Sequence, residues 1–118
     1  MKVLYVTSEA WPLIKTGGLG DVSGSLPPAL LAEGIDVRLL LPGYPSAIAL
    51  AGPLKQVAEI DLRPFFRPLV RLLEGRLPGT RVKAWLVDCP PAFDRAGNPY
   101  HNDDGLSWPD NAQRFALL

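Results

Sequence analysis

Residues 15–22 of the chain combine the features of an anion-binding loop. They read Lys-Thr-Gly-Gly-Leu-Gly-Asp-Val and follow an apolar segment, Val3–Val6. Three glycines within four positions let the backbone turn tightly and approach a ligand closely. A helix that begins at these glycines directs its unpaired N–H groups and the positive end of its dipole at the loop. With the ammonium of Lys15 beside them, these donors predict a site for a phosphate-bearing small molecule.

The loop departs from two common phosphate-binding fingerprints. No Gly-Lys-Ser or Gly-Lys-Thr follows the glycines, so it is not a Walker A loop. As a dinucleotide fingerprint it nearly fits at Gly18 and Gly20, but Ser23 stands at the third glycine position. The acidic residue expected at the end of the second strand is also absent, since that strand ends in Leu-Leu-Pro. The pattern disfavours NAD, and spacing alone leaves open a purely structural turn.

The segments around the loop read as a β-α-β unit. Lys2–Thr7 is a short apolar run with β-branched residues, typical of a buried parallel strand. An apolar stripe with helical spacing starts near Gly18 and stops at Gly34, although two adjacent prolines predict a kink or a tightened turn within it. Residues 35–41 form a second apolar run. A strand, helix and strand of these lengths predict an α/β, Rossmann-like parallel sheet with a right-handed crossover.

The second half of the sequence is less regular. Arginines recur every four residues, which matches a helix, but neighbouring prolines oppose one, and we favour the strands of an edge hairpin. The residues concerned are Arg63, Pro64, Arg67, Pro68 and Arg71. Residues 82–87 predict a further strand, and residues 93–109 a polar loop with turn signals. Asp110 stands at the N-cap position of a helix that carries Phe115.

Bulk properties restrict the class of protein. The 118 residues fit one small domain, and 47% hydrophobic with 20% charged residues is typical of a soluble globular chain. Twelve basic and twelve acidic side chains cancel, so no overall field attracts nucleic acid. Half of the basic residues lie between Arg63 and Lys83, which we interpret as a solvated face rather than a glucan- or nucleic-acid-binding patch. The apolar runs are too short for a membrane span, and the single Cys89 suits a reducing cytoplasm.

These segments resemble, in order, the N-terminus of bacterial glycogen synthases and plant starch synthases. The resemblance starts with Val-Leu-Tyr-Val-Thr-Ser-Glu at residues 3–9 and continues through Pro12 and the Lys-Thr-Gly-Gly-Leu signature at residues 15–19. Further matches are Leu26-Pro27, Ala29-Leu30, Gly34, Val37-Arg38, Leu41-Pro42, Tyr100-His101, Asp110-Asn111 and Arg114-Phe115. The segment between residues 46 and 81 is the least distinctive part of the match.

The resemblance implies a retaining glucosyltransferase of the GT-B type, in which two Rossmann-like domains face each other. Such enzymes transfer glucose from ADP-glucose, or in some cases UDP-glucose, to the non-reducing end of an α-1,4-glucan. They need no metal and no other cofactor, so positive side chains and helix ends must stabilise the departing diphosphate. The implied partners are ADP-glucose and the glucan, with neither nucleic acid nor a membrane, and the oligomeric state is left open.

The resemblance also implies a set of substrate-binding residues: Lys15, Thr16, Gly17, Gly18, Asp21 and Tyr100. The lysine matches the residue that contacts the phosphates of the donor. The first two glycines bring backbone N–H groups to the donor at the cleft between the domains. The aspartate matches a carboxylate near the sugar, which either accepts sugar hydroxyls or holds the loop. The tyrosine matches one implicated in substrate binding.

The resemblance further implies that residues 1–118 are an incomplete N-terminal domain of such an enzyme. The rest of this domain and the whole second domain are then absent. The family's histidine-rich stretch and the basic pair and glutamate of its second domain have no counterpart here, and His101 is not the family's catalytic histidine. We therefore expect no catalytic residue in this chain and no activity of the chain alone. The alternative is a non-catalytic α/β module that binds a glucan or a phosphate-bearing ligand.

Overall fold

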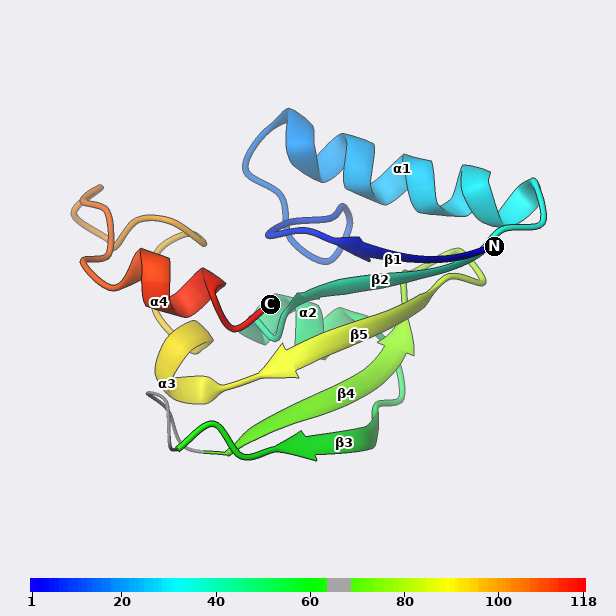
Figure 1. Ribbon diagram of the computed structural model, residues 1–118. Coiled ribbons are helices and arrows are strands. Elements are labelled where there is room, and N and C mark those ends of the chain that lie inside the picture. Colours follow the sequence, from blue (N-terminus) through cyan, green and yellow to red (C-terminus); the bar gives the residue numbers. More distant parts are fainter. Residues whose placement is uncertain (64–68) are drawn as a thin grey trace.

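The computed structural model describes residues 1–63 and 69–118 and forms a sheet with helices around it (Figure 1). In this part of the chain the sheet has five strands in the order β1-β2-β5-β4-β3. The strands are β1 (Lys2–Val6), β2 (Asp36–Pro42), β3 (Lys55–Ile60), β4 (Val70–Arg76) and β5 (Lys83–Asp88). The helices are α1 (Gly18–Ala32), α2 (Pro45–Leu50), α3 (Pro90–Phe93) and α4 (Asn111–Phe115).

The predicted β-α-β unit is confirmed. Strands β1 and β2 pair in parallel, with Lys2 opposite Asp36, and β2 pairs in parallel with β5. Helix α1 connects the first two strands and packs along β2, as Figure 1 shows. It remains a single α-helix through both internal prolines, Pro27 and Pro28. Proline lacks an N–H, so Pro27 costs α1 one helical hydrogen bond. Its ring is buried and contributes to packing instead.

Strands β3 and β4 are the antiparallel part of the sheet. They form an antiparallel hairpin, and β4 also pairs antiparallel with β5, so the sheet is mixed. Only residues 61–69 separate β3 from β4, and a parallel connection needs about a dozen residues or more. A hairpin does lie at this edge of the sheet, but its strands are not those that we favoured: of the residues named for them, Arg71 lies in β4 and Arg63 in the connection. Three of the residues that made it ambiguous lie outside the described residues: Pro64, Arg67 and Pro68.

Two local features of the helices differ from the expectations. Helix α2 was not predicted; it begins with a proline, Pro45, where a missing N–H costs nothing, and it buries Ala47. Asp110 does precede α4, as predicted, but its side chain makes no capping hydrogen bond to the helix backbone. Its carboxylate accepts hydrogen bonds from Arg95 instead, at 2.6 and 2.7 Å. The pair joins the loop after α3 to the start of α4.

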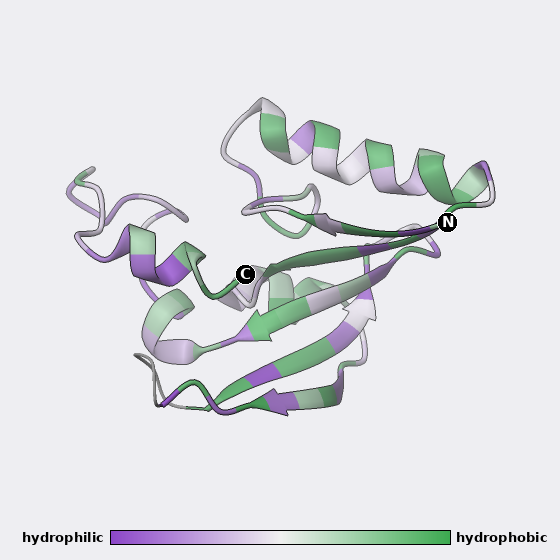
Figure 2. Cartoon of the chain, in the orientation of Figure 1, coloured by the Kyte–Doolittle hydropathy of each residue, from purple (hydrophilic) through white to green (hydrophobic). Residues whose placement is uncertain are grey.

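Hydrophobic residues run along the central strands β2 and β5, whereas β3 and β4 carry hydrophilic bands (Figure 2). On one face of the sheet, the side chains of Leu39, Leu41 and Leu86 are fully buried. Part of the basic charge on β4 and β5 is paired locally, because Arg71 contacts Asp88 and Lys83 contacts Glu74. These ion pairs agree with the interpretation of this region as a solvated face. None of the helices in the described part of the chain is long and apolar enough to cross a membrane.

The other face of the sheet, which we call the open face, carries an apolar groove of about 540 Å³. Its lining residues are Leu4, Leu40, Ile60, Leu62, Val70, Leu72, Trp85, Val87, Ala116, Leu117 and Leu118. Leu4 is 50% exposed and Ile60 is 46% exposed, although both belong to strands. Trp85 packs against the core but stays partly exposed on this face. The open face therefore leaves large apolar side chains in contact with water, a feature that favours association with another surface.

We predict that the purified 118-residue chain self-associates through the open face. Replacing two exposed residues of this face with lysine, as Leu4→Lys and Ile60→Lys together, should make the chain largely monomeric at the same concentration. Leu106→Lys is the control, because Leu106 is 65% exposed in a loop that does not line the groove. Light scattering of the three samples measures the effect. A monodisperse wild-type monomer, or equal association of all three samples, would contradict the prediction.

Candidate functional site

The loop between β1 and α1 is organised by one buried carboxylate, that of Glu9, which is only 2% exposed. Its Oε1 accepts hydrogen bonds from the backbone N–H groups of Gly17 (3.3 Å) and Gly20 (3.0 Å). Its Oε2 accepts from the hydroxyl of Thr16 at 2.6 Å and from the backbone N–H of the same residue at 3.3 Å. The hydroxyl of Tyr100 also donates to Oε2, at 3.2 Å. Five donors from two distant segments thus converge on a single side chain.

The hydrogen bonds lower the pKa of the Glu9 carboxyl below its ordinary value of 4.5. Burial by itself raises this pKa, because it penalises the charged form. The hydrogen bonds from Thr16, Gly20, Tyr100 and Gly17 stabilise the charged form and outweigh that penalty. The carboxylate also lies against the N-terminal turn of α1, where the helix dipole favours negative charge. Glu9 is therefore an anion at neutral pH.

Backbone contacts shape the rest of the loop. A bridge joins Ala10 to Ile14, and the peptide bond between Trp11 and Pro12 is cis. The backbone N–H of Trp11 donates to the carbonyl of Gly20 at 2.9 Å, which fastens the loop to the first turn of α1. Any Cβ on Gly24 would lie 2.5 Å from the carbonyl oxygen of Trp11, so helix and loop pack this closely only with glycine there.

Ser23 explains why the dinucleotide fingerprint fails at its third glycine. Its side chain is fully buried between helix α1 and strand β1, and its hydroxyl lies 3.0 Å from that of Thr7. The Thr7 hydroxyl donates onward to the carbonyl of Glu9 at 2.9 Å. A dinucleotide-binding domain has glycine at this position so that helix and strand pack closely. Here the serine side chain fills the space and, through Thr7, supports the backbone of Glu9.

Lys15 and Asp21 form an exposed ion pair at the mouth of the loop. The Nζ of Lys15 lies 2.7 Å from both carboxylate oxygens of Asp21, and the two side chains are 40% and 59% exposed. The stem of Lys15 passes over Gly20, where an added Cβ would come within 2.9 Å of its Cγ. The glycine therefore makes room for the lysine. The ammonium of Lys15 is held by a carboxylate six residues along the chain.

Gly17 and Gly18 have a different environment from the other two glycines of this region. A Cβ added to either one would meet no heavy atom within 4 Å, and neither has a positive φ. Internal packing and backbone strain therefore give no reason for glycine at these positions. Both residues leave the backbone bare at the start of α1, next to Lys15, where an external ligand can approach closely.

Tyr100 connects this loop to the segment that follows β5. Its hydroxyl lies 2.7 Å from the Ser8 hydroxyl, and its ring contacts that of Phe115 at 5.8 Å between centroids. The hydroxyl of Tyr44, which follows β2 and precedes α2, donates to the Ser8 carbonyl at 2.9 Å. Burial raises the pKa values of both tyrosines, and Glu9 contributes to both shifts. Both hydroxyls are therefore protonated donors at neutral pH.

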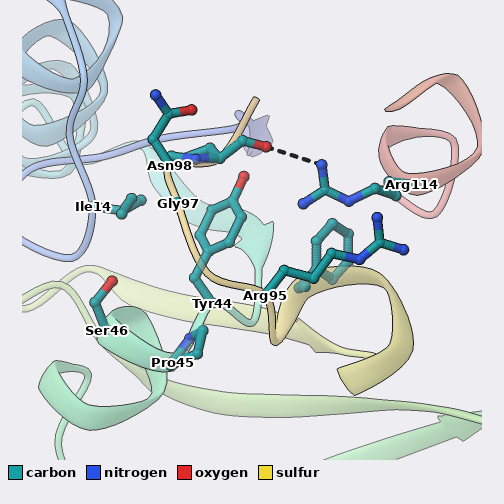
Figure 3. A pocket seen from close by; sticks show the side chains of 10 residues that line it. Ile14, Tyr44, Pro45, Ser46, Arg95, Gly97, Asn98 and Arg114 are labelled. Carbon is teal, nitrogen blue, oxygen red and sulfur yellow. Dashed lines mark hydrogen bonds between the residues drawn. The ribbon is translucent and has the colours of Figure 1, made fainter. Parts of the chain in front are cut away.

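A pocket of about 240 Å³ lies beside the loop (Figure 3). Ile14 contributes one wall, residues 44–46 after β2 a second, and residues 93–99 with Arg114 the remainder. Arg114 donates to the carbonyl of Pro99 at 3.0 Å, the dashed line in Figure 3, and also to Ala92 and Asn111. Its guanidinium holds this wall together. The other arginine of the pocket, Arg95, is paired with Asp110.

In the described part of the chain, His101 and the acidic residues belong to several separate segments. The described residues contain no group of three or more His, Cys, Asp or Glu side chains placed to hold a metal ion. His101 lies in the loop after α3, where it forms a bridge with Ser107, and its backbone N–H donates to Asn98. These contacts of His101 lie within its own loop and not in the glycine loop.

The structure brings together most of the residues singled out from the sequence. Thr16, Gly17 and Tyr100 meet at Glu9, and Lys15 and Asp21 meet each other at the mouth of the loop. Sequence reasoning missed Glu9 itself. The available signal was its position, since an acidic residue between the first strand and a glycine-rich helix start is placed to accept hydrogen bonds from unpaired backbone N–H groups.

The sheet and site define an α/β domain of Rossmann-like topology, with its glycine loop at the carboxyl end of the first strand. Residues 2–118 match the family described as the starch synthase catalytic domain. The chain belongs to this family. It is 57% identical over 119 residues to a glycogen synthase of Paramagnetospirillum magneticum, and 56% identical over 118 residues to glycogen synthase 1 of Methylococcus capsulatus.

These matches span the whole of this chain but only about a quarter of the relatives, 24% and 23% of their lengths. Among solved structures, the chain is similar to the catalytic domain of starch synthase IV from Arabidopsis thaliana bound to ADP and acarbose. The TM-score is 0.62 and the identity 26%, over 86% of this chain and 21% of that one. The fold and the family agree with the resemblance found in the sequence.

We predict that the Glu9 carboxylate makes stability depend on pH in a defined window. Its pKa is lowered in the folded state, so its contribution is complete above pH 4.5 and is lost as the pH falls further. Glu9→Gln should lower the free energy of unfolding by roughly 1–3 kcal/mol at pH 7, and the difference from wild type should shrink below pH 4.5. Urea unfolding of the Leu4→Lys, Ile60→Lys chain, followed by tryptophan fluorescence, measures both. A difference that stays constant down to pH 3 would contradict the assignment.

Proposed function

We propose that the chain is the N-terminal part of a retaining glucosyltransferase that transfers glucose from ADP-glucose to the non-reducing end of an α-1,4-glucan. The proposal is supported by the family, by relatives named glycogen synthase, and by a structural neighbour bound to ADP and acarbose. The choice of ADP-glucose over UDP-glucose follows the resemblance. A free, buried Cys89 also supports placing the enzyme in the cytoplasm.

The observation that carries the proposal is the bare backbone beside Lys15. Gly17 and Gly18 leave open space at the N-terminal turn of α1, and Lys15 holds its ammonium over that turn. A diphosphate is matched by this combination of a cation, a helix N-terminus and close backbone access. In a reaction without a metal ion, such groups supply the positive charge that stabilises the departing diphosphate.

The remaining signature residues then take supporting roles. Asp21 holds the Lys15 ammonium until the donor arrives, and the phosphates then compete for that ammonium. Of the two roles that the resemblance left open for Asp21, this ion pair favours the holding role. Thr16 and Tyr100 both donate their hydroxyl protons to Glu9, so we assign them to keeping the loop in place around the donor.

We further propose that catalysis needs a longer protein than these 118 residues. The described residues supply one wall of a cleft, and transfer between two substrates requires both to be held in line and shielded from water. Residues 1–118 are then a partial N-terminal domain, and the catalytic groups lie outside it. The open face and the free edge of β1 are where further elements of that domain would pack. The chain alone should transfer no glucose.

The test uses a hybrid enzyme in which this chain replaces the segment that it matches in the Paramagnetospirillum magneticum glycogen synthase. We predict that the hybrid incorporates glucose from ADP-glucose into glycogen. Lys15→Ala should remove a charge-assisted hydrogen bond, worth roughly 1.5–3 kcal/mol, and raise the KM for ADP-glucose about 10- to 150-fold. Steady-state kinetics with varied ADP-glucose measure this change.

The matched control is Lys55→Ala, which removes an exposed lysine from β3, far along the sheet from the loop. It should leave the KM for ADP-glucose unchanged. An active hybrid in which Lys15→Ala has no effect on this KM, with the fold intact by circular dichroism, would contradict the phosphate role. A folded but inactive hybrid would favour the alternative of a non-catalytic binding module.

A further inference from the structure

We propose that Glu9 is the positioning residue of the donor-binding loop: its carboxylate acts as a fixed internal anion that holds residues 16–20 in the conformation that presents Lys15 and the bare glycines to the donor. This inference rests on the proposed function, because it assigns a role within the same site. It concerns a residue that touches neither the diphosphate nor the sugar in that proposal.

Hydrogen bonds to Glu9 fix the backbone of the glycine loop. Both carboxylate oxygens are used, and their partners include the backbone N–H groups of Thr16, Gly17 and Gly20. A glycine-rich segment has many alternative conformations in the absence of such contacts. Three backbone bonds to one buried, immobile acceptor fix the turn that leads into α1. The stem of Lys15 is then held in place over Gly20.

The negative charge of Glu9 determines where a diphosphate can bind near the start of α1. The first N–H groups of a helix are the usual place for a bound phosphate, and Glu9 already occupies two of those near the start of α1, from Gly17 and Gly20. A phosphate placed on the same two N–H groups would have to displace a buried carboxylate. The geometry therefore directs the diphosphate outward, to the exposed Lys15 ammonium and the bare backbone at Gly18.

Glu9 also links the glycine loop to the segment after β5. Tyr100 belongs to the segment after β5, and its hydroxyl donates to Glu9 while it lies 2.7 Å from the hydroxyl of Ser8. The carboxylate thereby sets the distance between the glycine loop and the wall that carries the neighbouring pocket. A residue in this position acts on the donor only through the segments that it holds.

The test compares Glu9 variants in the hybrid enzyme. Glu9→Ala removes every acceptor, and we expect the KM for ADP-glucose to rise at least about tenfold, the factor that corresponds to about 1.4 kcal/mol. The kcat and the KM for glycogen should change by less than about threefold, as for a loss confined to donor binding. Glu9→Gln keeps one acceptor and should give a smaller rise. Glu33→Ala, an exposed glutamate that ends α1, is the matched control and should have no effect.

A merely structural role gives a different result. It would lower the amount of active enzyme, and hence the apparent kcat, while the KM of the remaining folded molecules stayed at the wild-type value. That outcome would overturn the inference. If Glu9→Ala does not fold, Thr16→Val replaces it, because this change removes only the shortest hydrogen bond to the carboxylate. A wild-type KM for ADP-glucose in folded Thr16→Val and Glu9→Gln enzymes would equally overturn it.

The Lys15 and Glu9 variants distinguish failure of the phosphate site from failure of the positioning role. A raised KM for ADP-glucose in Lys15→Ala, together with a wild-type KM in the Glu9 variants, would refute the positioning role and leave the proposed function standing. An unchanged KM in Lys15→Ala would refute the phosphate site itself. Raised values in both sets are the result that we expect.

Discussion

The interaction on which the site depends is the burial of one carboxylate among backbone N–H groups. Glu9 has lost nearly all contact with water, and burial of a charge is costly unless hydrogen bonds replace the solvent. The loop provides those bonds by folding around it, and α1 begins where the loop ends. The conformation of the glycine segment, the position of Lys15 and the docking of Tyr100 therefore follow from satisfying this one group.

The scaffold explains why this carboxylate is where it is. Parallel strands place their carboxyl ends at a common edge of the sheet, and the loops after β1, β2 and β5 meet there. Glu9 comes from the first of these loops, Tyr44 from the second and Tyr100 from the third. The antiparallel hairpin of β3 and β4 extends the sheet sideways beyond β5, on the side opposite β1, and contributes no residue named in the site.

Sequence reasoning succeeded where a local pattern decides the structure. The apolar runs of β2 and β5 identify buried strands without tertiary information. The runs of β1 and α1 predict the type of element but not its burial, because Leu4 of β1 is 50% exposed and α1 buries Gly20, Ser23 and Pro27. Sequence reasoning failed where the outcome depends on contacts between distant residues. Nothing local indicates that the carboxylate of Asp110 pairs with Arg95, and a six-residue helix such as α2 is too short for a clear periodicity. In the site, residue types predicted an anion-binding loop, but the partner that Glu9 finds in Tyr100 is 91 residues away.

The most direct test is a crystal structure of the hybrid enzyme with ADP bound. We expect a phosphate oxygen within hydrogen-bonding distance of the Lys15 ammonium, with Asp21 released from that ammonium or sharing it. The carboxylate of Glu9 should accept a hydrogen bond from the N–H of Gly20, as it does in this structure. A phosphate seated on the N–H groups of Gly17 and Gly20, with Glu9 displaced from them, would contradict the account.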